Sequence, residues 1–331
     1  MLKALPRLNL TAVLALAALA DLLLFRLASL LFLPSHAHGA TLVLSRLGLF
    51  MSNLGGVLGL VLVAVVLVHA LRGNTIFPRS MRITVSTIGL FFVLLATAGV
   101  LTLPVPDRFT AYLRISHAFL AAFVAAGLWH RGCPVRLKMV LTLFAAPIVL
   151  QAATMFCERM GWSPRFAIQG ARLAQASAFS ALLLSPLLVP PRPRRGRQLA
   201  AMLVGGLIGF ALLGLAMVRY FGLAQVVALY GLHFDLPAFA DPAGKSYAIM
   251  VALAYVSVTV ATIASLSGHA TSRLIGYGLI LLAATGHQVV SPNNGLFSLC
   301  GLCALALGAV RLEDEASQVP NPTAAPTSPF S

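Results

Sequence analysis

Ten apolar runs, each about as long as the hydrocarbon core of a bilayer is thick, dominate this chain of 331 residues. A helix needs about 20 apolar residues to cross that core, and water-soluble chains do not repeat such runs. The runs therefore predict an all-α fold, a polytopic transmembrane helical bundle over residues 1–311. They lie at residues 10–33, 46–70, 83–103, 110–130, 137–156, 167–189, 198–220, 245–267, 271–289 and 294–310.

The composition agrees with a membrane-embedded chain and argues against a nucleic-acid partner. Only 9% of the residues are charged and 59% are hydrophobic, whereas soluble domains carry about 25% charged residues. The net charge is +15, but the basic residues fall at the ends of the apolar runs and form no patch interleaved with aromatic residues. The four cysteines are scattered, so no disulfide framework is indicated.

The distribution of basic residues predicts the orientation of the chain. With the N-terminus inside, the inner loops carry clusters of Lys and Arg, and the outer loops carry far fewer of them. Cytoplasmic loops are enriched in these residues, so we expect both termini in the cytoplasm and the bundle in a bacterial-type inner membrane. The inner positions are Lys3, Arg7, Arg72, Arg79, Arg82, Arg131, Arg136, Lys138, Arg192, Arg194, Arg195, Arg197 and Arg273.

The two ends of the chain raise separate questions. Residues 312–331 are polar and rich in proline, which predicts a disordered cytoplasmic tail. At the other end, the small residues "ALA" at 18–20 precede Asp21 and resemble a signal-peptidase site. Cleavage there would leave nine spans and an outside start. Because the apolar run continues through Leu33, we favour an uncleaved first helix.

Asp21 and Arg26 interrupt the first apolar run. A central Asp or Arg costs about 2.5 to 3.5 kcal/mol on the insertion scale. On an α-helix, five residues correspond to about 140° of rotation and about 7.5 Å of rise, so the two side chains are not natural neighbours. Arg26 can extend to the interface, whereas Asp21 cannot reach either surface. Because ionisable residues inside a membrane usually serve function, Asp21 is the leading candidate.

Further polar residues fall at a similar depth, in the predicted outer halves of other runs. Together they predict an outward-opening polar cavity with Asp21 at its floor. The alternative is structural: the arginines extend to the interface and His117 is a hydrogen-bonded packing residue. The candidates for solute binding or coupling are Asp21, Arg26, Arg114, His117, Gln151, Arg172 and His287.

Two similar glycine motifs suggest a duplicated architecture. The second run contains "GGVLG" at 55–59 and the seventh contains "GGLIG" at 205–209, and both are small-xxx-small packing faces. They predict a 5+5 inverted repeat with halves 1–160 and 161–311, although short matches also arise by chance in spans rich in Ala, Gly and Leu. In topology alone, the layout resembles that of drug/metabolite-type permeases. The predicted packing residues are Gly55, Gly59, Gly205 and Gly209.

These features favour a permease that moves a small polar or anionic solute by secondary transport, since the sequence holds no ATP-binding motif. One alternative is a membrane-embedded enzyme that acts on a lipid or lipid-linked substrate at the outer face, where an acid or base is needed. Its candidate residues are Glu158, His233, Asp235 and Asp241.

A second alternative is a haem-binding or sensor subunit with two axial histidines, for which His117 and His287 have matched depth. We nevertheless predict no cofactor and no metal. The motif "CGLC" at 300–303 lies inside an apolar run, where cysteine is a small packing residue. The predicted partners are the lipid bilayer, the solute and other membrane subunits.

Overall fold

The computed structural model describes residues 9–27, 40–72, 76–101, 107–131, 133–162, 164–189, 242–285 and 292–317, and within them the regular secondary structure is helical. The all-α prediction is therefore confirmed for these residues. The elements are α1 (Leu10–Leu19), the π-helical η2 (Ala20–Leu27), α3 (Ala40–Leu71), α4 (Arg79–Val100), α5 (Asp107–His130), α6 (Val135–Arg159), α7 (Pro164–Leu184), the 3-10 turn η3 (Ser185–Leu188), α10 (Pro242–Leu266), α11 (Ala270–Thr285) and α12 (Pro292–Ser317).

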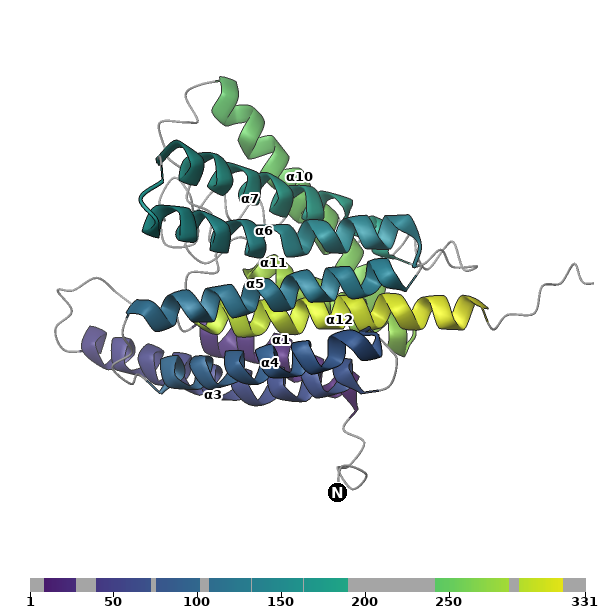
Figure 1. The fold of residues 1–331 in the computed structure, drawn as a ribbon, viewed down its shortest axis with the longest axis horizontal. Helices are drawn as coiled ribbons and strands as arrows, with labels where there is room; N and C mark the ends of the chain where they lie inside the picture. The colour runs from purple at the N-terminus through teal and green to yellow at the C-terminus, as the bar shows by residue number, and fades with distance from the viewer. Residues whose placement is uncertain are drawn as a thin grey trace, which may run out of the picture.

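Several of these helices are suited to a bilayer, and the chain is a multi-pass membrane protein (Figure 1). Among the described residues, 6 helices are long and apolar enough to cross, and the apolar helices Leu10–Leu24, Leu253–Leu266 and Thr271–Ala283 are shorter. Large apolar side chains are exposed, such as Ile83 at 78%, as contact with lipid requires. The predicted run 198–220 lies outside the described residues, so ten spans are not confirmed.

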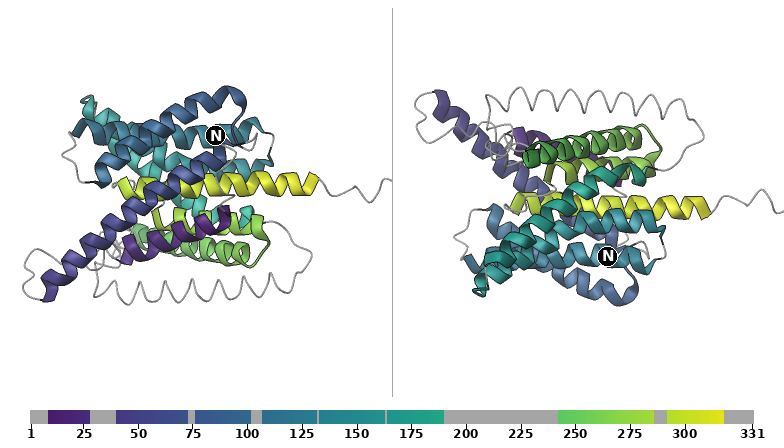
Figure 2. Two further views of the ribbon diagram at one scale, coloured as in Figure 1. Left: turned by 90° about the horizontal axis from the view of Figure 1, so that it is seen from below. Right: turned by 90° about the horizontal axis from the view of Figure 1, so that it is seen from above.

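Helix α12 is the helix around which the others are arranged. Its most apolar stretch is 89% buried, against 33% to 61% for the other long helices. Figure 2 shows it between α4, α5 and α6 on one side and α1, α10 and α11 on the other, with α3 and α7 running obliquely, and α7 packs against α10. The sequence explains this position, because residues 295–310 are apolar or small on all faces, and a helix of that kind is buried on all sides.

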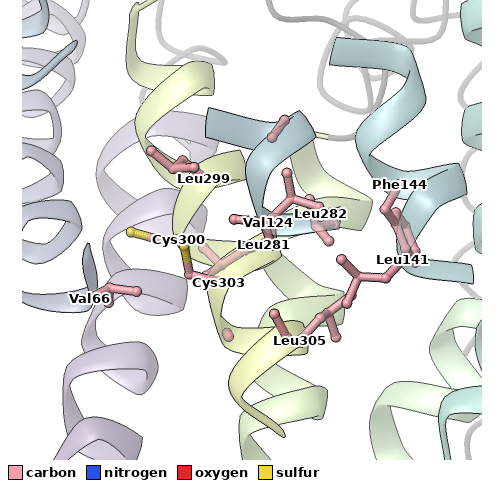
Figure 3. Close-up of a cluster of buried hydrophobic side chains, with 14 of the residues drawn as sticks. Val66, Val124, Leu141, Phe144, Leu281, Leu282, Leu299, Cys300, Cys303 and Leu305 are labelled. Carbon is pink, nitrogen blue, oxygen red and sulfur yellow. The ribbon is translucent and has the colours of Figure 1, made fainter. Parts of the chain in front are cut away.

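The core around α12 is apolar and closely packed (Figure 3). Cys300 and Cys303 are free, fully buried cysteines that lie among side chains from α3, α5, α6 and α11. Beside them the backbones of α11 and α12 touch: a Cβ on Gly301 would lie 3.1 Å from the carbonyl oxygen of Gly278 and 2.8 Å from Cγ of Leu282. The "CGLC" motif therefore lies in a packing interface in this structure.

The predicted packing glycines of the second run also lie at helix contacts. A Cβ on Gly55 of α3 would lie 3.1 Å from Cβ of Leu24 in η2. A Cβ on Gly59 would lie 3.2 Å from Cζ of Phe297 in α12. Gly205 and Gly209 lie outside the described residues, so the matching face of the seventh run and the 5+5 repeat stay predictions.

Loops that the charge pattern assigns to one side of the membrane gather at one end of the bundle. Ile76, between α3 and α4, packs so closely on α5 that a Cβ on Gly127 would lie 2.8 Å from its carbonyl oxygen. At the start of α11, the Thr271 hydroxyl donates a hydrogen bond to Oε1 of Glu315, near the end of α12. The side of the membrane that this end faces stays a prediction.

Cys133, in the turn between α5 and α6, joins the same end to α12. Burial and a hydrogen bond with Glu313 raise the pKa of the Cys133 thiol to about 12. Helix α12 continues through Ser317, past the predicted start of the disordered tail at residue 312. Its acidic last turns therefore belong to the bundle, because they hold the loops of neighbouring helices.

Gly301→Ala should destabilise the bundle by about 1 to 3 kcal/mol, the usual cost of overpacking, because the added methyl group meets Leu282 and the Gly278 backbone. Gly89→Ala in α4 is the matched control: its Cβ would be 3.6 Å from Cδ1 of Leu67, an ordinary contact, so it should be neutral or slightly stabilising. Free energies of unfolding from a denaturing-detergent titration check this. Equal losses would contradict the close contact between α11 and α12.

Cys133 should resist alkylation at neutral pH, because only the thiolate reacts and its pKa is raised to about 12. Its labelling rate with a maleimide should rise about tenfold per pH unit without a plateau below pH about 10. Glu313→Gln removes a negative charge that disfavours the thiolate, so it should lower the pKa and speed labelling at a given pH. Asp314→Asn, which changes the next carboxylate, is the control. A plateau near neutral pH, measured by mass spectrometry of Cys133, would contradict the contact with Glu313.

Candidate functional site

Asp21 lies on the inward face of the first helical segment. Helix α1 begins after Asn9, whose side-chain oxygen accepts a hydrogen bond from the backbone N–H of Thr11 at 3.1 Å, a common N-cap. The buried positions of α1 follow the spacing of three and four that marks one helix face, and Asp21 continues that face with 0% exposure. These buried residues are Leu10, Val13, Leu14, Ala17 and Ala18.

The backbone around Asp21 is π-helical, over Ala20–Leu27. Leu19, Leu22 and Leu23 are 53%, 44% and 44% exposed, so these leucines face the surroundings while the carboxyl group points into the protein. Segments with i→i+5 hydrogen bonds are rare inside α-helices and occur frequently at functional sites. The apolar first run therefore changes its helical geometry at its acidic residue.

The fold brings α3, α11 and α12 to this segment. η2 packs against α3 and α11, and the contact with α3 is close because Gly55 has no side chain to hold Leu24 away. From α12, the Cys300 thiol is near enough to Asp21 for the two groups to interact electrostatically. The side chain of Asp21 thus lies between its own segment, η2, and the central helix α12.

His117 of α5 forms a second buried polar contact with α12. Its Nε2 is 3.1 Å from Oγ of Ser298, and the Ser298 hydroxyl donates to the Gly295 carbonyl oxygen at 3.2 Å. If the imidazole is protonated at Nε2, its N–H donates to the Ser298 hydroxyl oxygen while that hydroxyl donates to the Gly295 carbonyl oxygen, so both bonds form at once. Nδ1 is then the acceptor without a hydrogen-bond partner among the described residues, and the ring of Phe92 packs against the imidazole at 5.6 Å between centroids.

The two polar contacts have similar depth but face different sides of α12. Ser298 and Cys300 are two residues apart, which on a helix is about 200° of rotation and about 3 Å of rise. The structure therefore does not bring Asp21 and His117 together, because the central helix separates them. Since Asp21 also has no accessible surface, the described conformation is closed around it, and the outward-opening cavity stays a prediction.

The remaining predicted site residues are spread over several helices. Arg114 of α5 is half-buried and donates from a guanidinium nitrogen to Sδ of Met155 in α6 at 3.4 Å. Gln151 of α6 is half-buried and Arg172 of α7 is exposed. His287 lies outside the described residues. The functional roles of these residues therefore stay predictions.

The spacing of Asp21 and Arg26 needs a correction. The expected 140° between them assumed an α-helix, but both residues lie in the π-helical η2. In a π-helix, each residue is hydrogen-bonded to the residue five positions away. The backbones of Asp21 and Arg26 are therefore about one turn apart. The side chain of Arg26 is outside the described part of the chain.

The residues expected for the alternative functions are mostly beyond the described ranges. Glu158 is exposed near the end of α6, and His233, Asp235 and Asp241 are not described. Within the described residues, no three His, Cys, Asp or Glu side chains are grouped as a metal site would require. The haem hypothesis is untested.

Sequence reasoning missed Ser298, although it is a hydroxyl residue in an otherwise apolar run.

Ser298→Ala should destabilise the protein by about 1 to 3 kcal/mol, the usual cost of leaving a buried polar group unbonded, because Nε2 of His117 loses its partner. Ser265→Ala is the matched control. Ser265 is also fully buried, but its Oγ has no hydrogen-bond partner among the described residues, so the substitution should be neutral or stabilising. Thermal unfolding in detergent compares the two variants, and equal losses would contradict the His117–Ser298 bond.

Comparisons with known proteins were made on the whole chain. No protein family, no curated protein and no solved structure matches it. Two features of the bundle bear on its function: the inward-facing Asp21 carboxyl group in a π-helical segment and the buried His117–Ser298 pair.

Proposed function

We propose that the protein is a permease that moves a small polar or anionic solute across the membrane by secondary transport, with Asp21 as the coupling group. The observation that carries this proposal is the complete burial of the Asp21 side chain on a π-helical segment of an otherwise apolar helix. An ionisable group at such a position costs several kcal/mol, and proteins keep such groups where they serve a function.

The proposed mechanism starts from the closed conformation around Asp21. A neutral acid is far cheaper to bury than a carboxylate, so a proton is the simplest coupling ion. Transport then requires η2 to move relative to α12 and expose the carboxyl group to water. π-Helical segments are among the places where helices bend, and the contact between η2 and Gly55 of α3 has no intervening side chain. Arg26, on the same π-helical segment as Asp21, would attract an anionic solute to the open site.

The proposed layout has ten spans, with residues 198–220 as the seventh and both termini in the cytoplasm. Its two halves, 1–160 and 161–311, would form an inverted repeat. In transporters of that architecture, substrate sites lie near the midplane on interrupted helices. Here the first helix changes from α-helical to π-helical geometry at Ala20 without unwinding. The lipid-modifying enzyme and the haem subunit stay alternatives, and a Soret band in the purified protein would favour the latter.

Asp21→Asn should abolish solute-driven proton movement without loss of the folded protein, because the amide cannot bind and release a proton. The assay uses proteoliposomes with a trapped pH-sensitive dye and outward or inward gradients of inorganic phosphate, succinate, glutamate or glucose. Glu158→Gln, which changes an exposed carboxylate on α6, should behave as wild type. Wild-type proton movement by Asp21→Asn would remove Asp21 from the mechanism.

A second readout of the same variants needs no solute. The infrared carbonyl band of a protonated, enclosed carboxyl group should be present in wild type and in Glu158→Gln, and should disappear in Asp21→Asn. If all three proteins give the same band, Asp21 does not hold a proton in the closed conformation.

A further inference from the structure

One ring nitrogen of the buried His117 side chain has no hydrogen-bond partner in the described part of the bundle. His117 is 1% exposed, and its Nε2 is hydrogen-bonded to Oγ of Ser298, whereas its Nδ1 is the unbonded atom. An unbonded polar atom is costly inside a membrane protein, where bulk water does not reach it. Buried polar atoms of proteins are usually bonded to a protein group or to an ordered water, so Nδ1 marks a place where another atom can bind.

Gly295 of α12 leaves space in front of this nitrogen. A Cβ on Gly295 would lie 3.6 Å from Nδ1 of His117 and 3.9 Å from Cζ of Phe92. These are ordinary contacts, so steric crowding does not require a glycine here. By contrast, a Cβ on Gly301 or Gly308 would lie 2.8 Å or 2.7 Å from a side chain of α11. Close packing explains those two glycines, whereas at Gly295 the missing side chain leaves room beside Nδ1.

The first turn of α12 borders the same space. Helix α12 begins at Pro292, and the Cα–Cβ bonds of a helix tilt towards its N-terminus, so a Cβ on Gly295 would point towards that turn. Proline has no N–H, and the next backbone N–H groups, of Asn293 and Asn294, have no acceptor within the helix. Two backbone donors therefore lie within one turn of the residue that faces Nδ1.

We propose that this site, bounded by Nδ1 of His117, Gly295 and the start of α12, binds a hydroxyl-type oxygen atom supplied by a water molecule. In the tautomer that makes both bonds of Ser298, Nδ1 is an acceptor, so its ligand must donate a hydrogen bond. The N–H groups of α12 are donors, so the same ligand must also accept. Water does both, whereas a carboxylate cannot donate and an ammonium group cannot accept.

The bound oxygen would join α5 to α12 a second time, beside the bond between His117 and Ser298. Buried water molecules make about three hydrogen bonds to polar groups of this kind, and such bridges are nearly as favourable in enthalpy as direct hydrogen bonds. The site lies on a different side of α12 from Asp21, and it does not depend on the proposed transport.

Gly295→Ala tests the site, because the added methyl group takes space that a ligand atom on Nδ1 needs. Gly89→Ala in α4 is the matched control: its Cβ would also lie 3.6 Å from the nearest side chain, but that neighbour is Cδ1 of Leu67, an apolar atom. Gly295→Ala should lower the unfolding temperature in detergent by a few degrees, and Gly89→Ala should not lower it. Equal unfolding temperatures would contradict the proposal, because packing alone predicts the same result for both variants.

The nitrogen NMR spectrum of protein with isotope-labelled histidine reports on Nδ1 directly. An unprotonated ring nitrogen that accepts a hydrogen bond resonates upfield of one that does not, and the His117 signal is assigned by its loss in His117→Gln. Without added solute, wild type and Gly89→Ala should show the hydrogen-bonded position, and Gly295→Ala the unbonded one. An unbonded or protonated Nδ1 in wild type would show that the proposal is wrong, and this spectrum decides even if Gly295→Ala fails to fold.

The same spectrum separates water from a hydroxyl group of a solute. If Nδ1 of wild type is hydrogen-bonded in buffer alone, and glycerol or glucose leaves its signal unchanged, water is the ligand. If Nδ1 becomes hydrogen-bonded only after glycerol or glucose is added, the oxygen belongs to a solute, and the assignment to water is wrong.

Discussion

The arrangement of this bundle depends on the burial of α12 on all its faces. In a bilayer, lipid tails are as apolar as leucine, so helices associate through close packing and not through exclusion from water. Helix α12 meets this requirement with small and apolar residues throughout 295–310, and at Gly301 its backbone touches that of α11. The helices α1, α3, α4, α5, α6 and α11 all pack against it.

The same helix determines how the two buried polar contacts relate. Ser298 binds His117 on one side, and Cys300 interacts with Asp21 on the other. An apolar helix between two polar groups keeps them sterically separate, because neither can reach the other without displacing it. A mechanism that uses Asp21 therefore takes its neighbours from η2, α3 and α11, and His117 is best explained as a residue that fixes α5 against α12.

Much of the fold could be predicted from the sequence, whereas the geometry of the candidate site could not. The described helices coincide with predicted apolar runs because run length is a direct consequence of bilayer thickness. The sequence could not predict that the Asp21 side chain points inward, because leucine and alanine cover all faces of α1 and give no periodic signal. The π-helical turn at Ala20 has no local motif either. It changes which residues are stacked, so the α-helical spacing expected for Asp21 and Arg26 was wrong.

Helix α12 is the last of the described helices to be synthesised, yet it occupies the middle of the bundle. Domains of a nascent chain generally fold in order from the N-terminus, but here the earlier helices would surround a groove that has no occupant until α12 has been synthesised. The described part of the bundle is therefore completed only when α12 arrives, and the pairwise contacts of the helices before it must be loose enough to admit it.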